Sequence, residues 1–136
     1  MEFVDASINE IPWFLTYMVT AIVLTLFYIV IYIWVTPHPE IKLIRENNIA
    51  AALAFSGSLI GFCLPLASAI ANSVSIIDCA IWGVIALIVQ IIIFFLVCLP
   101  FPGISKRIEN GEIASGAWLG VASLAGGILN AASMMS

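Results

Sequence analysis

Apolar stretches of membrane length alternate with short polar loops along this chain, and this pattern predicts four membrane-spanning helices. The predicted spans cover residues 13–35, 49–72, 79–99 and 113–133. Each has about 20 residues or more, the length that an α-helix needs to cross a bilayer. Residues 1–12 are predicted to form an acidic outer tail ending at Pro12, a favourable first residue for a helix. We therefore expect one all-α membrane domain over residues 1–136.

The second predicted span has two unlike faces. Bulky apolar residues form one stripe at helical spacing, and small or weakly polar residues form the other. The small stripe consists of Ala50, Ala54, Gly57, Gly61, Pro65, Ser68 and Asn72. The fourth span repeats it with Gly116, Gly120, Ser123, Gly127 and Asn130. Small residues let helix backbones approach in lipid, so the two spans are predicted to pack through these faces, within one chain or between subunits.

An internal repeat begins at each of the two longer loops. The segment PHPEIKLIRENN-IAAALAFSG aligns with PFPGISKRIENGEIASGAWLG, with one extra residue in the second copy. Both copies contain Pro-x-Pro, Glu-Asn and then Ile-Ala. A repeat unit of two helices keeps its orientation in both copies. The alignment therefore predicts two tandem helical hairpins related by a pseudo-two-fold axis along the membrane normal.

The basic residues predict how the chain is oriented. All four of them lie in the two longer loops: Lys42, Arg45, Lys106 and Arg107. The positive-inside rule places these loops in the cytoplasm and both termini outside. The formal net charge of −4 then belongs to Glu2, Asp5, Glu10 and Asp78 on the outer side.

Composition narrows the classes of function. With 63% hydrophobic and 9% charged residues and a mean hydropathy of +1.19, the chain has no room for a soluble catalytic domain. The negative charge argues against nucleic acid as a partner. The three cysteines show neither CxxC nor Cys/His metal spacing, so we expect small buried thiols. We predict no catalytic residues, no cofactor and no metal, and hence no enzyme.

Aromatic and polar residues near the ends of the spans carry further expectations. Five aromatic residues of the first span are expected in the interfacial belts: Trp13, Tyr17, Tyr28, Tyr32 and Trp34. His38 lies between two prolines, and we expect it to be solvated, as loop histidines usually are; the alternative is a pH-sensing role. Asn47 or Asn48 is expected to cap the second span.

Five polar residues are candidates for the lining of a solute or ion pathway: Gln90, Asn72, Asn130, Ser68 and Asp78. An amide in mid-membrane needs a partner that lipid does not provide, so Gln90 is the sharpest of them. The alternative is an interhelical hydrogen bond that fixes the packing register. For Asn72, Asn130, Ser68 and Asp78 the alternative is capping of helix ends and connectors.

The sequence also resembles a known family. The run ENNIAAALAFSGSLIGFCLPLASAIANSVSIIDCAIWGVIALIVQ, followed by RIENGEIASG and GGILNAASM, is similar to the YjfL-type bacterial inner-membrane proteins. This family is catalogued as a domain of unknown function, 350, with four predicted spans. The resemblance implies a bacterial inner-membrane location and this topology, and it implies no catalytic residue, cofactor or substrate.

Two functions follow as hypotheses. The first is an oligomeric channel or transporter for a small solute or a cation, because an inert anchor needs no polar intramembrane groups. The second is a non-transporting scaffold that recruits a cytoplasmic partner or supports the response to membrane stress through its two basic loops. In either case we expect the bilayer as surroundings and a homodimer or higher homo-oligomer.

Overall fold

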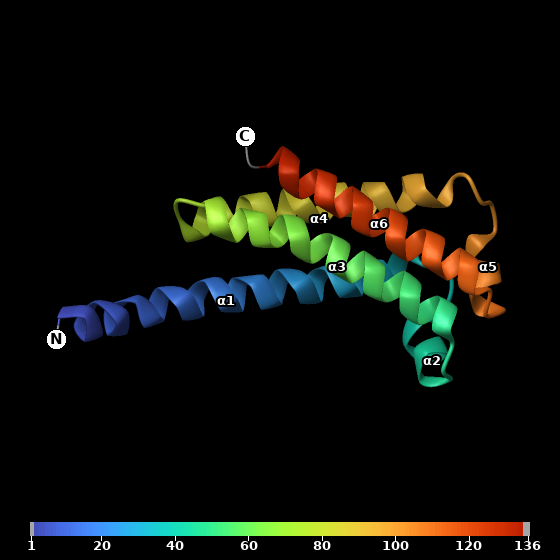
Figure 1. Ribbon diagram of the computed structural model, residues 1–136, viewed down its shortest axis with the longest axis horizontal. Helices are drawn as coiled ribbons and strands as arrows, with labels where there is room; N and C mark the ends of the chain where they lie inside the picture. Colours follow the sequence, from blue (N-terminus) through green and yellow to red (C-terminus); the bar gives the residue numbers. More distant parts are fainter. Residues whose placement is uncertain (1, 135–136) are drawn as a thin grey trace.

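Four long helices and two short ones make up the described chain (Figure 1). The computed structural model describes residues 2–134, and the side chains of residues 4, 5 and 7–134. The Glu2 side chain, predicted to carry outer charge, therefore lies outside the description. The helices are α1 Glu2–Val35, α2 Glu40–Arg45, α3 Ile49–Asn72, α4 Ile76–Cys98, α5 Ile104–Glu109 and α6 Ile113–Ser133. The all-α class is confirmed, as are four helices long and apolar enough to cross a membrane.

Helix α1 is longer than the sequence predicted. It runs from Glu2 through Pro12 to Val35 without a break, so the prediction that a helix starts at Pro12 is wrong. A proline inside a helix removes the hydrogen bond of its own nitrogen and crowds the carbonyl four residues before it, which can kink a helix without ending it. The Thr16 hydroxyl donates to the Pro12 carbonyl at 2.8 Å. At about 1.5 Å per residue such a helix exceeds the ~30 Å hydrocarbon core, and its N-terminal part extends beyond the other helices (Figure 1).

The closest packing in the molecule joins α3 to α6. A Cβ atom added to Gly57 would overlap the backbone of Gly120, and one added to Gly116 would overlap the Ala50 carbonyl. Gly127 stands in the same relation to Gly61. Only glycine permits such an approach, because any side chain would push the two backbones apart. The small faces of the two spans thus meet within one chain.

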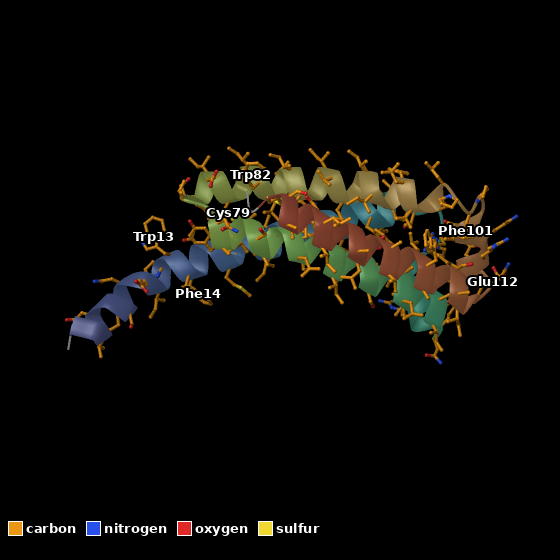
Figure 2. All side chains as sticks on the ribbon, turned by 45° about the horizontal axis from the view of Figure 1, so that its top comes forward. Trp13, Phe14, Cys79, Trp82, Phe101 and Glu112 are labelled. Atoms are coloured by element: carbon orange, nitrogen blue, oxygen red, sulfur yellow. The ribbon has the colours of Figure 1, made fainter. Side chains whose placement is uncertain are left out.

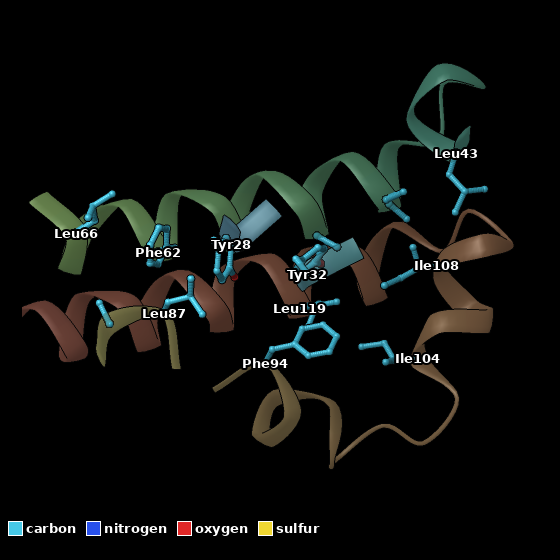
Figure 3. Packing of buried hydrophobic residues seen from close by; sticks show 14 of the residues in the cluster. Tyr28, Tyr32, Leu43, Phe62, Leu66, Leu87, Phe94, Ile104, Ile108 and Leu119 are labelled. Atoms are coloured by element: carbon cyan, nitrogen blue, oxygen red, sulfur yellow. The ribbon is translucent and has the colours of Figure 1, made fainter. Parts of the chain in front are cut away.

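Helix α1 packs on α3 and α4 through one stripe of side chains (Figure 3). Leu24, Tyr28 and Tyr32 follow at four-residue intervals and are buried. Tyr28 stacks on Phe62 with ring centroids 4.5 Å apart, and Tyr32 lies edge-on to Phe94 at 5.3 Å. The expectation of an interfacial belt is therefore wrong for these two tyrosines, since their spacing places them on the face that α1 turns toward the bundle.

The outside of the bundle is apolar. Trp13 and Phe14 project from α1 and Trp82 from α4 (Figure 2), and the first two are 62% and 64% exposed. Such a surface suits acyl chains, as expected of a membrane protein. Cys79 is buried but Cys63 is exposed, so the expectation of a buried thiol is wrong there. Cys63 lines a shallow apolar pocket whose walls come from α1 and α3.

The two loops that contain α2 and α5 end in the same way. Both short helices close with a Schellman motif, in which a residue of positive φ follows the last turn. That residue is Asn47 in the first loop, with φ 65°, and Gly111 in the second, with φ 81°. The paired hydrogen bonds are Asn47 N to Ile44 O, Asn48 N to Leu43 O, Gly111 N to Ile108 O and Glu112 N to Arg107 O. Asn47 and Gly111 thus occupy equivalent positions in the two loops. The one extra residue in the second copy of the aligned segment must therefore lie before this motif. The duplication itself stays a prediction.

Candidate functional site: a line of buried polar groups

Gln90 lies at the centre of the bundle, fully buried between helices. Its Nε2 donates to the Ser123 carbonyl at 2.9 Å, across the interface between α4 and α6. Its Oε1 has no hydrogen-bond partner among the described residues. The amide also lies against Gly61 of α3, where an added Cβ would come within 2.8 Å of Nε2. Gln90 therefore faces protein, and one of the two polar atoms of its amide has no partner.

Three other predicted residues lie toward the ends of α3 and α6 that are farthest from α2 and α5. Asn130 Nδ2 donates to the Ala86 carbonyl at 3.4 Å, from a side chain that is 8% exposed. The Ser68 hydroxyl donates to the carbonyl of Ala131, the neighbour of Asn130, at 3.3 Å. Asn72 is exposed and donates to the Ser68 carbonyl at 2.9 Å. The Ser68 contact therefore joins α3 to α6, and the Asn130 contact joins α6 to α4.

Asp78 has a local role at the start of α4. Its Oδ2 accepts from the Val74 amide at 3.1 Å, and its own amide donates to the Ser75 hydroxyl at the same distance. This reciprocal arrangement fixes the tight connector between α3 and α4 and caps the helix. Neither of these two hydrogen bonds of Asp78 reaches Gln90 or Asn130.

The chain at the start of α2 carries a buried histidine–glutamate pair that sequence reasoning did not find. Thr36, His38 and Glu40 are buried, whereas Pro37 and Pro39 between them are exposed. Proline disfavours helix at its own position and at the preceding one, and an extended chain turns alternate side chains to one side. His38 Nε2 lies 2.5 Å from Glu40 Oε1, and both side chains have no exposed surface. The expectation of a solvated His38 is therefore wrong.

Hydroxyl groups continue this cluster into the bundle. The Tyr32 hydroxyl lies near the Glu40 carboxylate and the Ser58 hydroxyl, and neither the Tyr32 nor the Ser58 oxygen makes a regular hydrogen bond in the described part. The Tyr28 ring lies next to Tyr32, with centroids 6.1 Å apart, and its hydroxyl is also buried and unpartnered. The cluster thus draws its side chains from α1, from the loop before α2 and from α3.

Together these groups form a series that follows α3, which we call the polar line. It consists of Glu40, His38, Tyr32, Tyr28 and Ser58 near the loops, Gln90 and Ser123 in the middle, and Asn130 and Ser68 toward the other end. Ser58 and Gly61, on which the Gln90 amide rests, are about one helical turn apart. From Ser58 to Ser68 the helix rises by about 15 Å.

The four basic side chains lie apart from the polar line. Lys42, Arg45, Lys106 and Arg107 are all exposed on the two loops. Arg107 and Glu112 approach to 3.8 Å with both side chains more than half exposed, so this pair adds little stability. In the described part of the chain no three His, Cys, Asp or Glu side chains gather as they would around a metal ion.

Some of the missed residues carried a readable signal. The sequence TPHPE alternates proline with polar residues, which predicts an extended strand with Thr36, His38 and Glu40 on one side. Leu24, Tyr28 and Tyr32 share one helical face, which favours packing over an interfacial position. Ser58 and Ser123 gave no signal, because serine is common in small-residue helix faces.

Comparison with known proteins gives the same family as the sequence motifs. Residues 6–134 match the family model described as Domain of Unknown Function (DUF350). The chain is 46% identical over 121 residues to the "UPF0719 inner membrane protein YjfL" of Escherichia coli strain K12, covering 89% of this chain and 92% of that protein. The protein of the same name from Escherichia coli O157:H7 matches equally well. No solved structure matches. With a family model over nearly all of its length and a close relative, the chain belongs to the DUF350 family of membrane proteins.

Proposed function

We propose that this protein moves a small solute or a cation across the bacterial inner membrane, along the polar line. One observation carries the proposal. In the described part of the chain, nine buried side-chain nitrogen and oxygen atoms make no regular hydrogen bond, and all belong to the polar line. Two of them, His38 Nε2 and Glu40 Oε1, face each other at 2.5 Å, which leaves seven without such a contact. An unpaired buried polar atom costs about 1–3 kcal/mol, so proteins rarely keep them without a function. A membrane anchor has no use for such groups.

The proposed orientation places α2 and α5 in the cytoplasm and both termini outside. Its support is the positive-inside rule together with the exposure of all four basic side chains on these loops. Alkaline phosphatase fused after residue 134 should then be active in bacteria, whereas green fluorescent protein at the same place should be dark. The opposite pair of results would reverse the orientation.

Reconstituted protein tests the transport function. Purified protein in liposomes should pass protons, other cations or small solutes faster than empty liposomes do. Gln90→Leu should lower that flux at least tenfold, because the variant loses the amide in the middle of the line. Ile88→Leu, at an exposed position of the same helix, is the matched control and should leave the flux unchanged. Wild-type flux no greater than that of empty liposomes would refute the proposal.

One observation favours the scaffold as the second candidate. Asn48 Nδ2 donates to the Ile108 carbonyl at 2.9 Å and so joins the two basic loops into one surface. A scaffold would bind a cytoplasmic partner there, and replacing Lys42, Arg45, Lys106 and Arg107 by glutamine should abolish the complex. Gln90→Leu should not affect it. A homodimer or higher homo-oligomer remains a prediction for either function.

A further inference from the structure

The buried pair of His38 and Glu40 has properties that a general solute pathway does not require. We propose that His38 and Glu40, together with Tyr32, form a proton-binding site at the loop end of the polar line, and that the transported ion is the proton. This proposal rests on the proposed transport function and names its substrate. A hydronium ion on the loop side gives one proton to the pair and leaves as water, so no redox partner is needed.

The chemistry of the cluster fits a proton better than a metal cation. An imidazole, a carboxylate and hydroxyl groups all accept or donate protons. A dehydrated metal cation needs several oxygen ligands, about six for Mg²⁺ and six to eight for Ca²⁺. The cluster offers one carboxylate, and no group of three metal-binding acidic, cysteine or histidine side chains occurs in the described chain.

Burial makes this pair sensitive to a single proton. Its other titratable neighbour is Tyr32 of α1. Tyr32 is surrounded in turn by Tyr28 of the same helix, the Ser58 hydroxyl of α3 and the apolar ring of Phe94 of α4. The basic residues of α2 and α5 are exposed. Gain or loss of one proton therefore changes the charge of a buried pair that no other described charge neutralises. In surroundings of low dielectric constant such a change acts strongly on nearby dipoles.

Hydroxyl groups extend this cluster from the loops toward the middle of the bundle. Tyr32 lies near Ser58, and Ser58 lies about one turn before Gly61, where the Gln90 amide rests. Each hydroxyl can accept one proton while it donates another. A proton that leaves the pair toward the middle of the bundle would pass these hydroxyls before it reaches the unpartnered Oε1 of Gln90 and the Ser123 hydroxyl.

Proton flux tests the site directly. Liposomes with reconstituted protein, an internal pH dye and a valinomycin-controlled potassium potential should acidify faster than empty ones. His38→Gln and Glu40→Gln should each lower the rate at least tenfold. Tyr32→Phe keeps the ring packing, removes only the hydroxyl, and should lower it at least threefold. Glu46→Gln changes an exposed carboxylate of the same loop and is the control that should leave the rate unchanged.

A second measurement is independent of transport. His38 is the single histidine of the chain, so ¹⁵N-histidine labelling gives one imidazole spectrum. Its pH titration should change in Glu40→Gln and stay the same in Glu46→Gln. A titration identical in wild type and Glu40→Gln would overturn the proton site even if the protein transports.

The outcomes separate the two proposals. Flux of another cation without proton flux, or proton flux that persists in both His38→Gln and Glu40→Gln, would overturn the proton site and leave transport standing. No flux of any solute would refute the transport function and with it the proton as its substrate. Loss of proton flux in both variants, with the Glu46→Gln control intact, supports the site.

Discussion

The Asn48 side chain is bonded to the Ile108 carbonyl, 60 residues further along the chain, at 2.9 Å. The same side chain accepts from the Ala51 amide at 3.0 Å through Oδ1. One residue therefore caps α3 and fastens the end of α5 to it. Position 48 is thus the place where the two loops are held in register.

Asn48→Ala should lower the free energy of unfolding by about 1–2 kcal/mol, because the variant loses an N-cap and the link between the loops. Reversible denaturation in mixed micelles measures this. Asn110→Ala, at an exposed position of the second loop, should change stability by less than about 0.5 kcal/mol. Equal losses in the two variants would contradict the role assigned to Asn48.

Gly57→Ala should destabilise the bundle by about 1–3 kcal/mol, because its Cβ would meet the backbone of Gly120, which cannot turn aside. The control is Gly83→Ala, where the near atom is the tip of the Leu24 side chain. The end of a leucine side chain can rotate away, so Gly83→Ala should cost clearly less. Thermal unfolding of the two variants in the same detergent gives the comparison.

Gln90→Leu should change stability by at most about 1.7 kcal/mol, since interhelical hydrogen bonds in membranes average about 0.6 kcal/mol. Ser123→Ala keeps the bond, because the acceptor is the backbone carbonyl of Ser123. A double-mutant cycle should therefore give almost no coupling between the two substitutions. A Gln90→Leu variant that fails to fold would show that the amide holds the bundle together.

Glu40→Gln should destabilise the protein by about 1–3 kcal/mol, because it replaces the carboxylate that is buried against His38 by an amide with different hydrogen-bonding groups. The comparison is Glu112→Gln, which breaks an exposed pair and should cost less than about 1 kcal/mol. Combining His38→Gln with Glu40→Gln should recover part of the loss. Strictly additive effects would mean that the two buried side chains do not interact.

The lengths of the apolar stretches and the polar loops between them were enough to predict the four spans, because a chain in lipid must form all its backbone hydrogen bonds within the helix. The two small faces were also readable, since the spacing of Gly57, Gly61, Gly116 and Gly120 is characteristic of close helix contacts. The Asn48 cap was one of two predicted choices and is confirmed. Each of these features depends on residues near one another in the sequence.

Tertiary contacts explain what the sequence did not reveal. Whether Tyr28 and Tyr32 lie at the membrane–water interface or in the core depends on which face of α1 packs against α3 and α4. His38 is buried because two prolines extend the chain across the end of the bundle, and burial of its partner Glu40 requires that same path. The Gln90 partner is a backbone carbonyl, which every residue possesses, so its choice of Ser123 left no mark in the sequence.

The glycine contact between α3 and α6 has a consequence for biogenesis. Helix α6 follows α3 and α4 along the chain, so during synthesis these two helices enter the bilayer before the partner that covers Gly57, Gly61 and Gln90. Until α6 has inserted, the small face of α3, which packs against another backbone in the folded protein, is exposed to lipid. A chain truncated before residue 113 would leave that face permanently exposed to lipid. We expect membrane quality-control proteases to degrade such a chain rapidly.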